Sequence, residues 1–137
     1  MSVRSFLDTN VLVYTDDGDA PSKQEAALDL VESAGFGGWG VVSTQVLQEY
    51  FAVATRKLGL PADIARAKVE IFGRLDVATT DVPAILGGID IHRLHGVGFW
   101  DGLIIQAARA AGCRILYTED LQHGRLFDGL EVVNPFA

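Results

Sequence analysis

Val3-Arg4-Ser5-Phe6-Leu7-Asp8-Thr9-Asn10 opens the chain with a short run that is mostly apolar and stops at three polar residues. Aspartate, threonine and asparagine in succession favour turns and strand ends, so we interpret residues 3–7 as the first strand of a sheet. This interpretation puts a carboxylate, Asp8, directly after an apolar strand. That is an unusual place for a charge unless it has a function.

Short apolar runs alternate with helical patterns along the rest of the chain. Further strands are expected at 41–42, 75–79, 114–117 and 131–133. Helices are expected at 22–34 with Ser22 as the cap, from 43 or 44 to 58, at 62–73, after Asp81, and at 100–111. Such alternation implies an α/β fold with a mostly parallel central sheet and helices on both faces.

Length and composition indicate one globular unit over residues 1–137, because 49% apolar residues are enough to fill one core. Cys113 is the only cysteine, so we expect a packed thiol and no internal disulfide. No apolar run approaches the roughly 20 residues that span a bilayer, and residues 1–10 lack the pattern of a secretory signal. The expected location is therefore the cytoplasm, with no membrane partner.

The net charge of −7 argues against nucleic-acid binding through a broad basic surface. Two divalent cations held by acidic residues would offset four of those charges. A local basic rim would then be able to hold a phosphate backbone. Arg56 and Lys57 are among the basic residues available for such a path, although a solvated surface role is the simpler interpretation for each.

Four acidic residues are candidates for one edge of the expected sheet. Asp8 and Asp120 each follow an expected strand, Asp101 opens a helix, and Glu49 lies on the helix after a strand. Carboxylates within about 4 Å of one another repel by several kcal/mol at an effective dielectric near 20, so a shared site needs compensation. Hard oxygen ligands suit Mg²⁺ or Mn²⁺, and such a metal activates water against a phosphodiester. Metal-assisted hydrolysis of nucleic acid follows as a hypothesis.

Other interpretations use the same residues. The chain has eighteen aspartates and glutamates, and these four could be ordinary caps, turn residues and surface charges. A phosphoryl-transfer enzyme with Asp8 as nucleophile is disfavoured, because Asn10 and Leu12 stand where that class has aspartate and threonine. A receiver domain is disfavoured because no lysine follows Lys68.

Four segments, in order and over nearly the whole chain, closely resemble the PIN domain, especially the VapC-type toxins of bacterial toxin–antitoxin pairs. They are Phe6-Leu7-Asp8-Thr9-Asn10-Val11-Leu12-Val13-Tyr14, Ser43-Thr44-Gln45-Val46-Leu47-Gln48-Glu49-Tyr50, Phe99-Trp100-Asp101-Gly102-Leu103-Ile104 and Leu116-Tyr117-Thr118-Glu119-Asp120-Leu121. The resemblance implies a PIN-like three-layer sandwich and a Mg²⁺- or Mn²⁺-dependent ribonuclease. One departure is Gly102, where the family often has alanine, which weakens that helix by up to about 1 kcal/mol.

The resemblance also implies roles for particular residues. Asp8 and Asp101 match central metal ligands, and Glu49 and Asp120 match ligands that act directly or through water. Asn10 and Thr118 match supporting positions. Glu119 is the ambiguous neighbour, but the family pattern places the acid two residues after the threonine, which favours Asp120.

The partners implied by the resemblance are an RNA substrate, a small antitoxin that blocks the acidic groove with a basic side chain, and a second copy of the chain in a homodimer. The alternative is a non-catalytic PIN-like module that binds metal or a basic partner peptide. We expect at least one of the four acids to have a raised pKa without metal. Among the aromatic residues, Trp100 is expected in the core and Trp39 is left open between packing and base stacking.

Overall fold

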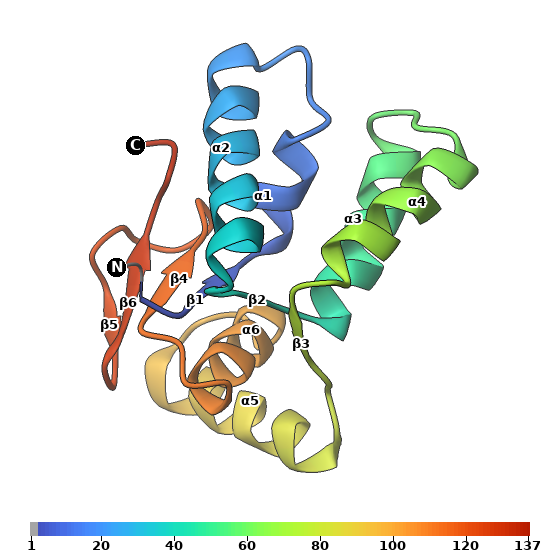
Figure 1. Cartoon of the computed structure of the whole chain (residues 1–137). Helices are drawn as coiled ribbons and strands as arrows, with labels where there is room; N and C mark the ends of the chain where they lie inside the picture. The colour runs from blue at the N-terminus through green and yellow to red at the C-terminus, as the bar shows by residue number, and fades with distance from the viewer. Residues whose placement is uncertain (1–2) are drawn as a thin grey trace.

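A six-stranded sheet runs through the centre of the protein in the computed structural model, which describes residues 3–137 (Figure 1). The strand order is β3-β2-β1-β4-β6-β5, and all neighbours are parallel except β5 and β6. The strands are β1 (Ser5–Leu7), β2 (Gly40–Ser43), β3 (Asp76–Ala78), β4 (Ile115–Tyr117), β5 (Leu126–Phe127) and β6 (Leu130–Val133).

Helices cover both faces of this sheet. They are α1 (Thr9–Tyr14), α2 (Pro21–Gly37), α3 (Thr44–Arg56), α4 (Ala62–Phe72), α5 (Val82–His95) and α6 (Phe99–Ala110). Helices α1 and α2 lie on one side and α5 and α6 on the other, while α3 and α4 form a hairpin that projects beyond β2 and β3 (Figure 1). The predicted α/β architecture with a mostly parallel sheet is confirmed.

The core explains why the first strand decides the fold. Phe6 and Leu7 of β1 are fully buried, since β1 lies between β2 and β4 with helices above and below. Leu116 of β4 and Val42 of β2 are also fully buried beside them. A strand covered on both faces needs apolar side chains on both, and Phe6 and Leu7 supply them.

The parallel register gathers the strand ends at one edge. Leu7 pairs with Tyr117, so Asp8 and Thr118 follow adjacent strands side by side. The Asp8 amide donates to the Tyr117 carbonyl at 3.1 Å and closes the ladder at this end. The same edge receives the start of α3 after β2, and therefore this edge is where functional residues can meet.

Several expected boundaries were wrong for physical reasons. The second helix begins at Pro21 after Ala20, with no side-chain cap, so Ser22 is not its cap. Proline suits the first helical position because its missing N–H would have had no partner there. The helix continues beyond its expected end at residue 34 to Gly37, and Gly38 after it adopts a positive φ of 68°.

Two short elements were not predicted. Helix α1 has only six residues, and the sequence shows no more than the apolar run Val11 to Tyr14 there. Strand β5 has two residues and depends on its antiparallel pairing with β6. Within residues 3–137, no helix has both the length and the apolar character that crossing a membrane requires.

Candidate active site

Asp8 stands at the junction of β1 and α1. It caps the helix, because its Oδ1 accepts a hydrogen bond from the Thr9 amide at 2.7 Å. Its Oδ2 accepts one from the Thr118 hydroxyl at 2.8 Å. The side chain is 5% exposed, and burial raises the pKa of Asp8 to about 7, with smaller contributions from the negative charges of Asp120 and Glu49.

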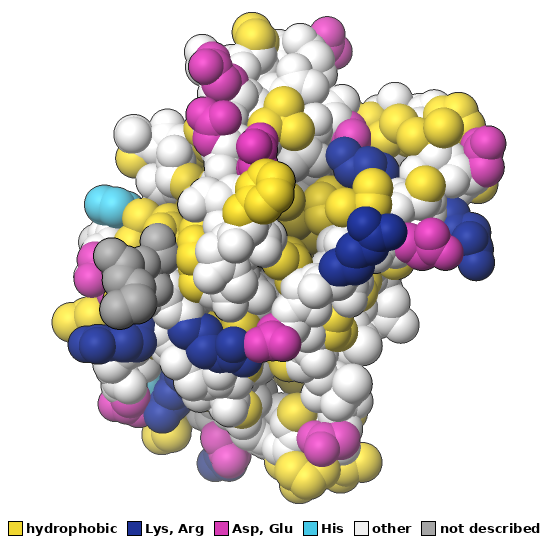
Figure 2. Space-filling model, viewed as in Figure 1, with side chains coloured by type: hydrophobic (Ala, Val, Ile, Leu, Met, Phe, Trp, Pro, Cys, Tyr) yellow, Lys and Arg dark blue, Asp and Glu magenta, His cyan; other side chains and the backbone are white. Residues whose placement is uncertain are grey.

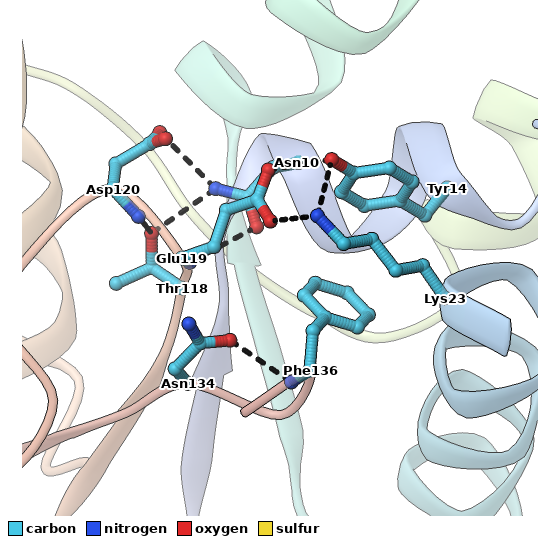
Figure 3. A network of polar contacts seen from close by, with 8 residues as sticks. All are labelled: Asn10, Tyr14, Lys23, Thr118, Glu119, Asp120, Asn134 and Phe136. Atoms are coloured by element: carbon cyan, nitrogen blue, oxygen red, sulfur yellow. Dashed lines mark hydrogen bonds and ion pairs between the residues drawn. The ribbon is translucent and has the colours of Figure 1, made fainter. Parts of the chain in front are cut away.

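Asn10 and Thr118 lie beside Asp120 (Figure 3), and Thr118 also hydrogen-bonds to Asp8. The Asn10 side-chain amide donates to the Thr118 hydroxyl at 3.0 Å and to Asp120 Oδ2 at 3.1 Å. The Thr118 hydroxyl also accepts from the Asp120 amide at 3.0 Å. Because the Thr118 hydroxyl also donates a hydrogen bond to Asp8, its one donor and both of its acceptor lone pairs are used. Both residues thus occupy the supporting positions that the resemblance implied.

Glu49 reaches the same edge from the second turn of α3. Its Oε1 accepts from the Thr9 hydroxyl at 3.0 Å and from the Gln45 side-chain amide at 3.3 Å. The Gln45 amide also lies 3.4 Å from the Trp100 carbonyl, which connects α3 to the start of α6. Sequence reasoning missed Thr9 and Gln45. The sequence features that could have indicated them are the position of Thr9 next to Asp8 and the position of Gln45 one helical turn before Glu49.

Asp101 lies in the first turn of α6 and is partly buried. Desolvation is the largest cause of its raised pKa, followed by the negative charges of Asp120 and Glu49. These are the two charges that also act on Asp8. The structure therefore brings the four predicted acids into one electrostatic neighbourhood, and the expected rise in pKa is found at Asp8 and Asp101, with burial as its main cause.

Asp8, Glu49 and Asp120 each accept hydrogen bonds from other groups of the protein. Among residues 3–137, no three histidine, cysteine, aspartate or glutamate side chains stand together as a ready metal site. The available donors are nevertheless oxygen atoms alone, the type that Mg²⁺ and Mn²⁺ prefer. Burial is the main cause of the raised pKa values of Asp8 and Asp101, and a cation would relieve the smaller contribution that comes from the charges of Asp120 and Glu49. The donor chemistry fits such a metal, which stays a prediction.

Glu119 points away from this cluster (Figure 3). Its two carboxylate oxygens accept from the Tyr14 hydroxyl at 2.7 Å and from Lys23 Nζ at 3.0 Å. The Lys23 ammonium also lies 4.9 Å from the Tyr14 ring centre. Because both oxygens of Glu119 are engaged, Asp120 is the better placed acid of the two.

A cleft of about 580 Å³ opens beside the acids, between α1 and α3. Figure 2 shows the face with α2 and α4 in front, where a hollow separates the helical hairpin from α2; α1 and α3 lie behind these two helices in the same view. Glu49 and Asp120 line the cleft together with Thr9 and Asn10. A ligand entering it would therefore meet the acidic cluster.

The structure contradicts the expectation for Trp100 and decides the open question of Trp39. Trp100 is 64% exposed, so its predicted place in the core was wrong: it lies in the first turn of α6, ahead of the buried stripe that starts at Leu103. Trp39 is 8% exposed and belongs to the core, 6.1 Å from the Tyr117 ring. Its indole N–H has no hydrogen-bond partner. Trp39 is therefore unavailable to stack on a base.

Known structures share this fold. Mycobacterium tuberculosis VapC20, a sarcin-ricin loop cleaving toxin, is 20% identical with a TM-score of 0.70, covering 85% of this chain and 89% of that one. A toxin–antitoxin complex from Klebsiella pneumoniae is 16% identical with a TM-score of 0.68, covering 96% and 97%. DNA-bound VapBC from Salmonella typhimurium is 22% identical with a TM-score of 0.66, again covering 96% and 97%. At these identities the likeness establishes the fold.

Sequence comparison adds the family. No curated protein sequence matches the chain. The PIN domain model matches residues 5–126, which include every strand from β1 to β4 and all six helices. The chain belongs to the PIN domain family.

Proposed function

We propose that this protein is a Mg²⁺- or Mn²⁺-dependent endoribonuclease that hydrolyses RNA phosphodiesters. The observation that carries the proposal is the acidic cluster on a PIN fold. In this cluster, the negative charges of Glu49 and Asp120 contribute to the raised pKa values of the buried Asp8 and the partly buried Asp101. A fold that brings four carboxylates into one neighbourhood, two of them lining a cleft, loses stability unless a cation binds there.

Each acid has a distinct proposed role. Asp8 and Asp101 would hold the metal directly, and Glu49 and Asp120 directly or through water. A metal bound there would supply an activated water and stabilise the charge that builds on the phosphodiester. Thr118 and Asn10 fix the orientation of Asp8 and Asp120 through their hydrogen bonds. Thr9 and Gln45 do the same for Glu49.

We further propose that the enzyme is the toxin of a toxin–antitoxin pair and acts as a homodimer. The similar structures, which include a toxin and two complexes, support the toxin role, and the homodimer rests on the family resemblance alone. A basic antitoxin side chain near metal-free carboxylates would relieve the same repulsion that a metal relieves. Expression of the protein alone should arrest growth, and co-expression of a small neighbouring reading frame should restore it.

The nuclease is tested with purified protein and a mixed cellular RNA pool, with and without Mg²⁺ or Mn²⁺. We expect metal-dependent cleavage that Asp101→Asn abolishes. The matched control is Asp63→Asn, which makes the same chemical change at an exposed position in the first turn of α4. If folded wild-type protein cuts no RNA under any of these conditions, a non-catalytic binding module becomes the better proposal.

A further inference from the structure

One face of α3 follows the cleft for two helical turns. Glu49, Ala52, Val53, Arg56 and Lys57 all line it, in the spacing of residues that share one side of a helix. Arg56 is seven residues beyond Glu49, which at 1.5 Å per residue places it about 10.5 Å further along the axis. The helix therefore carries a carboxylate at one end of the cleft and two cations at the other.

The opposite wall contributes polar, acidic and apolar side chains. Asn10 and Asp120 lie at the acidic end, and Val13 of α1 lines the cleft with Ala52 and Val53 of α3. Small apolar side chains between an acidic and a basic end give a surface for the ribose or base of a bound strand. The two cations at the basic end would contact one of its phosphates.

Arg56 and Lys57 have no acidic partner elsewhere in the part of the chain that the structure describes. The ion pairs there engage other cations: Arg4, Lys23, Arg66, Lys68 and Arg109. Arg56 and Lys57 are both exposed. In a protein with a net charge of −7, two free cations in the cleft that also holds the acidic cluster are available to a ligand.

Two further acids line the cleft, and neither neutralises these cations. Glu119 is engaged by Lys23 and Tyr14. Asp17 accepts a hydrogen bond from the Asp19 amide at 3.1 Å, within its own loop. Without Arg56 and Lys57 the cleft would present mainly negative charge to an incoming polyanion, and would repel it.

We propose that Arg56 and Lys57 form a phosphate subsite that holds the RNA backbone away from the scissile bond. This inference rests on the proposed ribonuclease function. A separation of about 10.5 Å corresponds to roughly three steps of a stacked strand at about 3.4 Å each, and to fewer steps of an extended one. The guanidinium of Arg56 can grip a phosphate through two donors, and the Lys57 ammonium adds a point charge.

A subsite of this kind positions the strand and reads no sequence. Its cations lie two helical turns from Glu49, so they stabilise the bound ground state and the transition state equally. Removing them should therefore raise KM and leave kcat unchanged. Binding should also depend less on salt. For a single strand, the slope of log Kd against log salt should fall by about 0.7 for each phosphate contact that is lost.

The test uses the double variant Arg56→Gln/Lys57→Gln. Binding of a short fluorescein-labelled single-stranded RNA is measured by anisotropy over a salt series, in the Asp101→Asn background so that the probe is not cut. We expect roughly tenfold weaker binding at low salt and a slope reduced by about 1.4. In the active background, KM should rise by a similar factor at constant kcat.

The control is Arg66→Gln/Arg74→Gln, which removes the same charge from exposed positions outside the cleft. If both double variants weakened RNA binding equally, the effect would come from net charge alone, and the proposed subsite would be wrong. Unchanged RNA affinity and salt slope with Arg56→Gln/Lys57→Gln would also overturn it. So would weakened binding of poly-L-glutamate with unchanged RNA binding, which would indicate an acidic peptide as ligand. Metal-dependent RNA cleavage by the wild type, scored separately, shows whether the proposed function survives such a result.

Discussion

At the scale of single residues, Asp8 makes stability depend on pH. Its pKa is about 7 in the folded protein against 3.8 for the free group, so the folded state binds a proton that the unfolded state releases. The contribution of this group is greatest below pH 4, falls as pH rises to about 7, and stays low above that. Three pKa units correspond to a loss of about 2–4 kcal/mol.

Asp8→Asn should therefore gain stability relative to wild type as pH rises. Urea denaturation of both proteins in the presence of a chelator, at pH 5 and pH 8, measures the difference. We expect the variant to gain about 2–4 kcal/mol over the wild type between these values. Parallel behaviour of the two proteins would contradict a raised pKa at Asp8.

Thr118 carries the hydrogen bonds that join Asp8, Asn10 and Asp120. Thr118→Val keeps the shape and removes the hydroxyl, which leaves the buried Asp8 carboxylate with one donor fewer. The free energy of unfolding should fall by about 1–3 kcal/mol, and RNA cleavage should fall with it. Thermal denaturation and the RNA assay measure both. The control Thr79→Val, at an exposed position, should change neither.

The candidate site was largely predictable at this scale because its residues follow strands and open helices, positions that sequence patterns show directly. Thr9 and Gln45 were missed because their role depends on which side chains the fold brings within reach of Glu49. Trp100 was wrongly placed in the core because periodicity puts it on the buried side of α6. Periodicity does not show that the first turn of α6 is left uncovered.

At the scale of elements, Asp16 joins the hairpin of α3 and α4 to the end of α1. The Tyr50 hydroxyl donates to Asp16 Oδ2 at 2.6 Å, and Lys68 Nζ lies 3.0 Å from Oδ1. Asp16 and Lys68 are largely shielded from solvent, with 13% and 24% of their side chains exposed. These contacts connect the two walls of the cleft, because α1 lines one wall and α3 the other.

Asp16→Asn should loosen that connection. The amide keeps one acceptor for Tyr50 but loses the charge opposite Lys68, so we expect a loss of about 1–2 kcal/mol. Amide hydrogen exchange should increase in α3 and α4 and stay constant in α5 and α6. Asp29→Asn, at an exposed position on α2, is the matched control. A uniform increase in exchange over all helices would instead indicate global destabilisation.

The elements themselves were predictable in proportion to their length. The long amphipathic helices show enough turns for a period to be recognised, and α3 and α6 were expected close to their observed bounds. Helix α1 spans fewer than two turns, so its apolar residues show no period. Strand β5 forms only through its pairing with β6, across a turn in which Asp128 and Gly129 have positive φ angles.

At the scale of the whole molecule, the net charge of −7 and the acidic cluster act together. The sequence argued against nucleic acid on charge alone, and the fold changes that argument by placing Arg56 and Lys57 in the same cleft as the acids. An acidic protein can bind RNA through such local asymmetry when a cation neutralises the cluster. Binding of metal should therefore affect both stability and affinity for RNA.

Mg²⁺ or Mn²⁺ should stabilise the folded protein, since the unfolded chain does not gather the four carboxylates. A ligand at a hundred times its Kd adds about 2.7 kcal/mol to the free energy of unfolding, which a thermal shift measures. The shift should be larger at pH 8 than at pH 6, because below its pKa of about 7 Asp8 is mostly protonated and the metal must displace that proton. Asp101→Asn should reduce the shift and Asp63→Asn should not. A shift that is equal in wild type and Asp101→Asn would place the metal elsewhere on this acidic protein, and the acidic cluster would then need another explanation.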